Sequence, residues 1–336
     1  MKKKVLIIGI SIVFLLIAAG VAAKVLLLGS YEYEPVRVEI PAGATSEDVE
    51  NILRDTLGKN FGDKTTRLWR IQNGKPTKAH GSYLVSPGES SLQLSRRLSQ
   101  GLQTPVRLTF NNMRTVGDLS RRISEVLELD SAAFHAAADS VLAAHGLSAE
   151  QEPSAFIPDT YEFYWTADAP YVVDRLFAER QTFWNDERRA AATRLGLSPE
   201  DVHTLASIVE GETAKADERP VVARLYLNRL AIGMPLQADP TVKFALKDPT
   251  LRRITSEHLK VESPYNTYSN QGLPPGPISI AERSTLQAVL DAPDHKYLYM
   301  CAKPDFSGYH DFATDYNRHR INAARYHRAL AARGIK

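Results

Sequence analysis

The sequence contains a single cysteine, Cys301, among 336 residues. It therefore cannot form an intramolecular disulfide, nor a zinc or iron–sulfur site built from several cysteines. An excess of one charge is also missing, since 41 Lys and Arg residues face 39 Asp and Glu residues. A formal charge of +2 gives no chain-wide electrostatic footprint for nucleic acid, so we expect no nucleic-acid partner.

The patterns of several common enzyme sites are absent as well. The nine histidines show no His-Glu-x-x-His spacing, and there is neither a phosphate-cradling Gly-Lys-Ser/Thr loop nor a Gly-x-Ser-x-Gly elbow. We therefore predict no metal and no cofactor. His310, His319 and His327 are expected at the surface or at the edge of the core.

The composition is otherwise that of a globular chain, with 43 % hydrophobic and 24 % charged residues. At roughly 100 to 200 residues per domain, the length predicts two domains with appendages. We expect an α+β fold with three parts. Residues 1–30 form a tail and a transmembrane anchor, residues 31–104 a small α+β domain, and residues 105–336 a larger, mainly helical domain with a few strands.

The first residues indicate the compartment. Lys2, Lys3 and Lys4 precede an uncharged run from Val5 to Ala23, which is long enough for one membrane-spanning helix of about 20 residues. A cleaved signal peptide is the alternative, although its apolar core of roughly 7 to 15 residues would be shorter. Because basic residues stay in the cytoplasm, we expect a single-pass protein of the inner (cytoplasmic) membrane whose body is extracytoplasmic.

Three segments share a strand, turn and helix pattern. In the first, residues 36–40 alternate between apolar and polar, and Ser46 can cap a helix that reaches Leu57. The second runs from Tyr83 to Leu98, and the third occupies residues 106–123 with Thr115 as the cap. Such units are common, so internal duplication does not follow from the pattern alone.

Helical periodicity dominates beyond residue 131, and two long loops interrupt it. The expected helices lie near residues 132–145, 171–195, 199–214 and 220–230. The loops at residues 234–241 and 263–279 are rich in proline, glycine and polar residues, and loops of this kind often carry function. Cys301 lies in an apolar run that predicts a strand residue rather than a nucleophile.

Two glutamates near the end of the third expected helix are not equivalent. At about 100° per residue, Glu212 projects between Leu205 and Ile208 on the apolar side. Glu210 points instead to the side that carries Ser207. A carboxyl group among apolar neighbours favours its neutral form, as the acid of a glycosidase does. Glu212 is therefore the candidate proton donor and Glu210 a supporting or surface acid, although an ordinary amphipathic helix would show the same pattern.

The two loops supply candidate groups for binding a sugar polymer. Hydroxyls, amides and aromatic faces suit a polyhydroxylated chain, and prolines constrain the segments that carry them. The same residue types also serve ordinary turns, and for each residue alone that explanation is favoured. The candidates for substrate binding or support are Gln237, Asp239, Thr241, Asn266, Thr267 and Tyr268.

A set of short motifs runs along the chain. They are Pro158-Asp-Thr-Tyr, Ala206-Ser-Ile-Val-Glu-Gly-Glu-Thr-Ala, Asn228-Arg-Leu with Gly233-Met, Leu236-Gln-Ala-Asp-Pro-Thr, Tyr265-Asn-Thr-Tyr through Gly272-Leu-Pro-Pro-Gly-Pro, and Tyr297-Leu-Tyr. Together these motifs resemble the MltG/YceG family of membrane-anchored endolytic murein transglycosylases, over essentially the whole chain. Two positions depart from the family pattern. Gly211 stands where relatives often carry a larger residue, and Ser154-Ala155 replaces Glu-Gly.

The resemblance implies a function for each part of the chain. Residues 31–104 would form a LysM-like domain and residues 105–336 the catalytic domain. Glu212 would be the catalytic residue, with Asn228 among its supporting residues. The implied reaction cleaves the β-1,4 bond between N-acetylmuramic acid and N-acetylglucosamine within glycan strands, without water. It leaves 1,6-anhydro ends and would terminate the elongation of nascent strands.

One carboxyl group suffices for this reaction, whereas ordinary glycosidases use two. The muramic C6 hydroxyl is the internal nucleophile, so one glutamate can donate a proton to the leaving oxygen and later accept one. The expected partners are peptidoglycan glycan strands, the membrane and peptidoglycan synthases. Two alternatives stay open: a non-catalytic peptidoglycan-binding scaffold of the growth machinery, and a water-using muramidase that would leave reducing ends.

Overall fold

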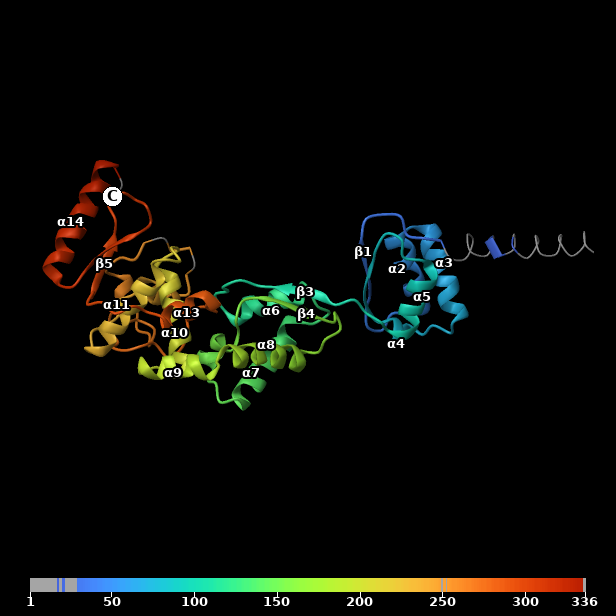
Figure 1. Cartoon of the computed structure of the whole chain (residues 1–336), viewed down its shortest axis with the longest axis horizontal. Coiled ribbons are helices and arrows are strands. Elements are labelled where there is room, and N and C mark those ends of the chain that lie inside the picture. Colours follow the sequence, from blue (N-terminus) through green and yellow to red (C-terminus); the bar gives the residue numbers. More distant parts are fainter. Residues whose placement is uncertain (1–16, 18–19, 22–28, 249, 252, 335–336) are drawn as a thin grey trace, which may run out of the picture. The chain divides into compact units, whose positions relative to one another are not determined.

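The computed structural model describes residues 17, 20–21, 29–248, 250–251 and 253–334 (Figure 1). The protein has an α+β fold, mostly helical, whose described strands pair in two-stranded sheets. The predicted membrane anchor lies almost entirely outside the described residues. Within the part that is described, no helix combines the length and the apolar character that crossing a bilayer requires.

The chain separates into two compact units. One contains the described residues up to Leu108, together with residues 124–129 and 161–168. The other contains residues 109–123, residues 130–160 and the chain from Ala169 onward.

The first unit is built on an antiparallel strand pair. Strand β1 (Val36–Ile40) pairs with β2 (Gly81–Val85), and Val38 lies opposite Tyr83. The inward side chains of both strands join a core with apolar residues of the helices, among them Trp69. The helices are α2 (Ser46–Leu57), α3 (Lys59–Ile71), α4 (Pro76–Ala79) and α5 (Ser91–Gln100).

The strand, turn and helix pattern is confirmed in all three predicted segments. The third comprises β3 (Val106–Thr109), which pairs with β4 (Thr160–Phe163), and α6 (Val116–Ser124) after its cap Thr115. The predicted cap of α2 is wrong by one residue. Thr45 rather than Ser46 caps this helix, because Thr45 and Asp48 form a reciprocal capping box.

The second unit is mainly helical. Its helices are α6, given above, and α7 (Ser131–Ala144), α8 (Ala169–Phe183), α9 (Asp186–Arg194), α10 (Pro199–Glu212), α11 (Arg219–Ala231), α12 (Asp239–Ala245), α13 (Arg283–Leu290) and α14 (Tyr316–Ala332). Short 3₁₀ turns cover Ala149–Ala155 and His258–Lys260. Strands β5 (Tyr299–Ala302) and β6 (His310–Ala313) form an antiparallel pair, which confirms Cys301 as a strand residue.

Two predicted boundaries are wrong, and local chemistry explains both. The segment expected near residues 171–195 is two helices, because the Asn185 side chain accepts a hydrogen bond from the Arg188 amide and starts α9. The end of the first predicted loop is helical, since Pro240 occupies the first turn of α12, where its missing N–H causes no loss.

Helix α10 lies at the centre of the second unit, against α11 and α13 (Figure 1). Ser198 and Asp201 form the capping box at its start, and Pro199 follows the cap. Burial is not restricted to the apolar side that carries Leu205 and Ile208, since every residue from Val202 to Val209 is buried. The helix is therefore enclosed on all sides and offers a rigid support to the residues at its C-terminal end.

His203 is a polar side chain that is enclosed in this core. It is fully buried, and its Nε2 accepts a hydrogen bond of 3.2 Å from Trp184 Nε1. Burial, with the charge of nearby Arg180 as a second cause, holds the pKa of His203 well below its usual 6.5. The native protein therefore keeps this imidazole neutral.

We predict that His203 makes stability depend on pH in acid. Below pH 6.5 the imidazole of His203 binds a proton in the unfolded chain but stays neutral in the folded chain. The free energy of unfolding therefore falls as the pH decreases, by up to about 1.4 kcal/mol per pH unit. The buried acids with raised pKa values change stability in the opposite direction. The contribution of His203 is therefore measured as the difference between a variant and the wild type. Chemical denaturation at several pH values should show a weaker loss below pH 6.5 in His203→Gln than in the wild type, and parallel curves would contradict the assignment.

Candidate active site

Glu212 is the last residue of α10 and contributes to the wall of a small cavity. The cavity has a volume of about 220 Å³. This is below the roughly 300 to 1,000 Å³ of typical ligand sites, so it suits the reacting part of a larger substrate. Its other lining residues are Leu225, Tyr226, Arg229, Leu236, Gln237, Asp239, Tyr268, Met300, Cys301, Ala302 and His310.

The surroundings of Glu212 set its protonation near neutrality. The Tyr226 hydroxyl donates a hydrogen bond of 2.9 Å to Glu212 Oε1. Loss of water on burial, and to a smaller extent the negative charge of Asp239, raise the pKa of Glu212 to about 7 against the lowering effect of this hydrogen bond. As predicted, the carboxyl group favours its neutral form more than an ordinary glutamate does. At pH 7 it can both give and take a proton.

Asp239 and Tyr268 form the polar side of this cavity. The Tyr268 hydroxyl donates a hydrogen bond of 2.6 Å to Asp239 Oδ1. Gln237 lies beside them with a positive φ of 51°, and its backbone N–H donates a hydrogen bond to the Thr267 carbonyl. The structure therefore brings three of the predicted loop residues, Gln237, Asp239 and Tyr268, to the same cavity as Glu212.

Three other predicted residues are buried and hold the two loops together. Thr241 and Thr267 are at most 1 % exposed, and their hydroxyls lie 2.9 Å apart. Thr267 Oγ1 also accepts a hydrogen bond from the Ala238 amide. Asn266, 1 % exposed, donates to the carbonyls of Leu259 and Val261 and accepts from the Tyr268 amide. These side chains position the loops and do not face the cavity.

Asn228 and Arg229 fasten the next segment of the cavity wall. Asn228 Nδ2 donates to the carbonyls of His295 and Tyr297, at 2.8 and 3.0 Å. Arg229 donates to the Leu298 carbonyl at 2.7 Å and to the Leu236 carbonyl at 2.6 Å. Asn228 therefore has a supporting position, whereas Arg229 also lines the cavity.

Sequence reasoning missed Tyr226, Arg229 and His310 as members of this site. Tyr226 has the helical spacing of a core residue, and its hydroxyl group was the one sign of a polar role. Arg229 stands in the Asn-Arg-Leu motif, which was the available signal. The expectation that His310 lies at the edge of the core is right, but its contribution to this cavity depends on the pairing of β5 with β6, which no local pattern shows.

Glu210 supports the domain from the opposite side of α10. Its side chain is 3 % exposed, so the surface alternative is wrong. Glu210 Oε1 accepts hydrogen bonds from the Glu282 amide at 2.8 Å and from Thr285 Oγ1 at 2.5 Å. Burial raises its pKa, while these hydrogen bonds lower it. Glu210 thereby pins the start of α13 to α10.

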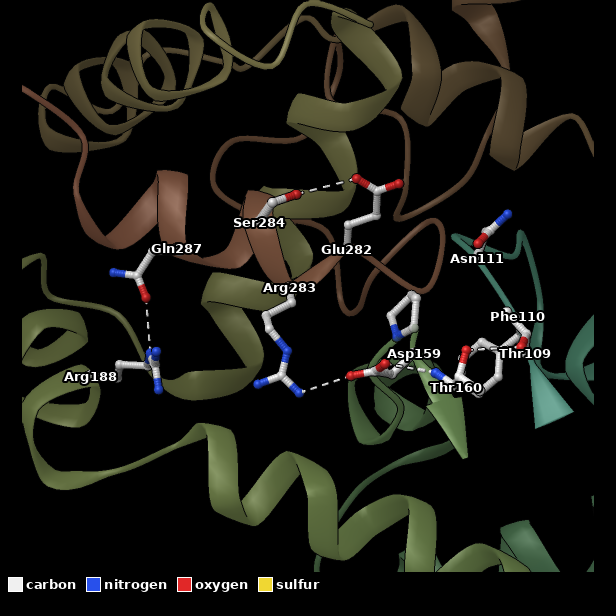
Figure 2. A pocket seen from close by; sticks show the side chains of 11 residues that line it. Thr109, Phe110, Asn111, Asp159, Thr160, Arg188, Glu282, Arg283, Ser284 and Gln287 are labelled. Atoms are coloured by element: carbon white, nitrogen blue, oxygen red, sulfur yellow. Dashed lines mark hydrogen bonds and ion pairs between the residues drawn. The ribbon is translucent and has the colours of Figure 1, made fainter. Parts of the chain in front are cut away.

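The segment that Glu210 holds borders a second, larger cavity of about 600 Å³ (Figure 2). Pro158-Asp-Thr lines it from one side, and Figure 2 shows Arg283 directed at Asp159, with 3.6 Å between their charged groups. Arg188 donates to Gln287 at 2.9 Å. The Pro158 motif therefore belongs to this cavity, whose lining does not include Glu212.

Gly211, between the two acids, permits a close approach. A Cβ atom at this position would lie 2.6 Å from Cβ of Pro240. Pro240 follows Asp239, so the missing side chain lets the start of α12 lie against the end of α10. This glycine therefore marks a close contact between the two helices.

We predict opposite shifts of the Glu212 pKa in two variants. Tyr226→Phe removes the hydrogen bond that favours the ionised form, so the pKa should rise above about 7. Asp239→Asn removes a negative neighbour, so the pKa should fall. Carboxyl ¹³C titration of glutamate-labelled protein measures both, with Glu212→Gln to assign the signal. Shifts of equal sign would show that this electrostatic account is wrong.

Asn266→Ala should destabilise the fold before it affects chemistry. The substitution leaves two partly buried carbonyls and one amide without their partner, with an expected cost of about 2 kcal/mol. Thermal unfolding should show the loss, and Asn270→Ala in the same loop is the matched control. Similar melting temperatures for the two variants would contradict this role for Asn266.

Named proteins are similar to parts of this chain. A protein of Bacillus subtilis strain 168, named endolytic murein transglycosylase, is 44 % identical over 103 residues, which is 30 % of this chain and 28 % of the relative. A protein of the same name from Streptococcus pneumoniae strain D39 is 26 % identical over 149 residues, 43 % of this chain and 27 % of the relative. The matched segments thus span less than a third of the lengths of these relatives.

The fold has a solved counterpart. The crystal structure of a YceG-like protein from Listeria monocytogenes matches with a TM-score of 0.57 and 27 % identity, and the match covers 86 % of this chain and 98 % of that one. The sequence pattern of the YceG-like family matches residues 38–325. Since that range includes most of both units and every residue of the Glu212 cavity, the chain belongs to the YceG-like family.

Proposed function

We propose that this protein is an endolytic murein transglycosylase, a lyase that cleaves peptidoglycan glycan strands at the N-acetylmuramic acid to N-acetylglucosamine bond. The observation that carries the proposal is Glu212, whose pKa is raised to about 7 in the wall of a cavity lined by polar loop residues. The relatives that match a part of this chain are named for the same reaction, which supports the proposal.

The proposed chemistry needs one group that acts as acid and then as base. Protonated Glu212 gives its proton to the glycosidic oxygen, which leaves as the 4-hydroxyl group of N-acetylglucosamine. The muramoyl C6 hydroxyl then bonds to C1 of the same sugar and returns its proton to Glu212. Tyr226 holds the carboxyl group in one orientation through both steps. Because the nucleophile is part of the substrate, much of the entropy cost of bringing reactants together is avoided.

A water-using muramidase is the second enzymatic candidate, and Asp239 favours its consideration. Asp239 puts another carboxylate in the cavity with Glu212, and glycosidases that use water or a covalent intermediate employ two such groups. Tyr268 occupies one oxygen of Asp239, which suits a positioning or electrostatic role. The two reactions differ in their products, since the transglycosylase leaves anhydro ends and the muramidase leaves reducing ends.

The cellular setting is part of the proposal. We propose that the apolar N-terminal run anchors the chain in the cytoplasmic membrane with its body outside, where peptidoglycan lies. Residues 31–104 would act as a LysM-like module and residues 105–336 as the catalytic domain. Peptidoglycan synthases are proposed partners, since cleavage near the membrane would end strands that are still being made.

Glu212→Gln should reduce cleavage by about 10² to 10⁴, because positioned proton transfer is typically worth that much. The amide keeps the shape of the side chain, so the melting temperature should stay close to that of the wild type. Mass spectrometry of purified murein after digestion measures both the rate and the type of end. Wild-type activity should also decline above about pH 7, where Glu212 loses its proton.

The control is Glu187→Gln, which changes an exposed glutamate on α9 and should cleave like the wild type. Anhydro ends from the wild type and the control, with few from Glu212→Gln, are the expected result. Equal rates in all three proteins would refute the role of Glu212. Reducing ends would indicate the muramidase, and binding of murein without any cleavage would indicate the scaffold.

A further inference from the structure

A buried carboxylate and a histidine meet beside the Glu212 cavity. Glu218, whose side chain is 7 % exposed, directly precedes α11, and His310 begins β6. Glu218 Oε2 lies 2.8 Å from His310 Nδ1, and Glu218 Oε1 accepts a hydrogen bond of 2.7 Å from the His310 amide. The histidine is thus held by its backbone and by its ring at the same time.

This contact fixes which ring nitrogen is free. Glu218 lies at the N-terminal end of α11, where the helix dipole favours negative charge. An ionised carboxylate only accepts hydrogen bonds, so Nδ1 of His310 must be the donor. Nε2 is then the remaining polar atom of the ring. Since His310 lines the cavity that Glu212 also lines, Nε2 is the atom that can meet a substrate there.

The same carboxylate is also connected to the neighbour of Glu212. Thr213 follows Glu212 in the chain, is 3 % exposed, and donates from Oγ1 to Glu218 Oε2 at 3.2 Å. Thr213 Oγ1 in turn accepts a hydrogen bond of 3.0 Å from the Lys215 amide. Glu218 therefore fixes the position of the His310 ring relative to the backbone that carries Glu212.

We propose that His310 is a second substrate-contacting residue of this site, whose Nε2 accepts a hydrogen bond from a hydroxyl group of the sugar bound beside Glu212, with Glu218 as its positioning residue. The inference rests on the proposed function, because it assigns a role in the same reaction. The contact holds the sugar in the orientation from which its C6 hydroxyl attacks. The competing explanation is that the pair only ties β6 to α11.

Two substitutions of His310 separate these explanations. The amide nitrogen of Asn can replace Nδ1 and keep the bond to Glu218, but it leaves no group at Nε2. The longer side chain of Gln places its amide near the position of Nε2 and loses the hydrogen bond that Nδ1 makes with Glu218. We expect His310→Asn to keep the wild-type melting temperature and lose at least about tenfold in kcat on soluble, uncrosslinked glycan strands. His310→Gln should lose stability but retain more kcat than His310→Asn.

A third variant tests the positioning role of Glu218. In Glu218→Gln the side-chain amide can donate to Nδ1, which favours the tautomer with its proton on Nε2. The ring would then present a donor where the substrate needs an acceptor. We expect kcat to fall by about tenfold or more with little change in KM, and the cavity to keep its shape. Unchanged kcat in this variant would overturn the positioning role.

The outcomes also distinguish failure of this inference from failure of the proposed function. Wild type and Glu212→Gln are assayed on the same strands. If the wild type produces no anhydro ends, the proposed function is wrong and the inference is wrong with it. If the wild type is active and depends on Glu212, equal activity of His310→Asn overturns the inference alone. Greater activity in His310→Asn than in His310→Gln would assign the pair a purely structural role.

Discussion

The hydrogen bond from Tyr226 to Glu212 joins two helices at the point where chemistry is expected, and the second unit is organised around it. A carboxyl group taken out of water must be neutral, paired or hydrogen-bonded. Here the hydrogen bond and the burial oppose each other and leave the pKa near 7. Because α10 is buried on every side along residues 202–209, it presents Glu212 from a rigid support.

Several of the polar residues around the cavity support it rather than face it. Asn228 and Asn266 donate hydrogen bonds to backbone carbonyls, and Thr241 bonds to the buried hydroxyl of Thr267. Long loops normally move, and buried polar contacts of this kind are a means of keeping them in one conformation. The side chains that line the cavity are thus positioned by others that do not face it.

Local sequence patterns predicted much of the secondary structure and part of the site. The strand, turn and helix units and the different positions of Glu210 and Glu212 depend on residues close in sequence, and the sequence predicted both. The break at Asn185 and the short helix after Ala238 escaped because polar turn residues also begin helices. Tyr226, Arg229 and His310 escaped for another reason. Their roles arise from contacts between segments distant in the chain, which a single sequence does not display.

The ring of Pro240 fills the space that a side chain at position 211 would need. The two positions therefore cannot vary independently. A larger residue at position 211 therefore requires Pro240 to shift, and with it the start of the helix that carries Asp239. Substitution of this glycine alone would thus disturb the acid that neighbours Glu212.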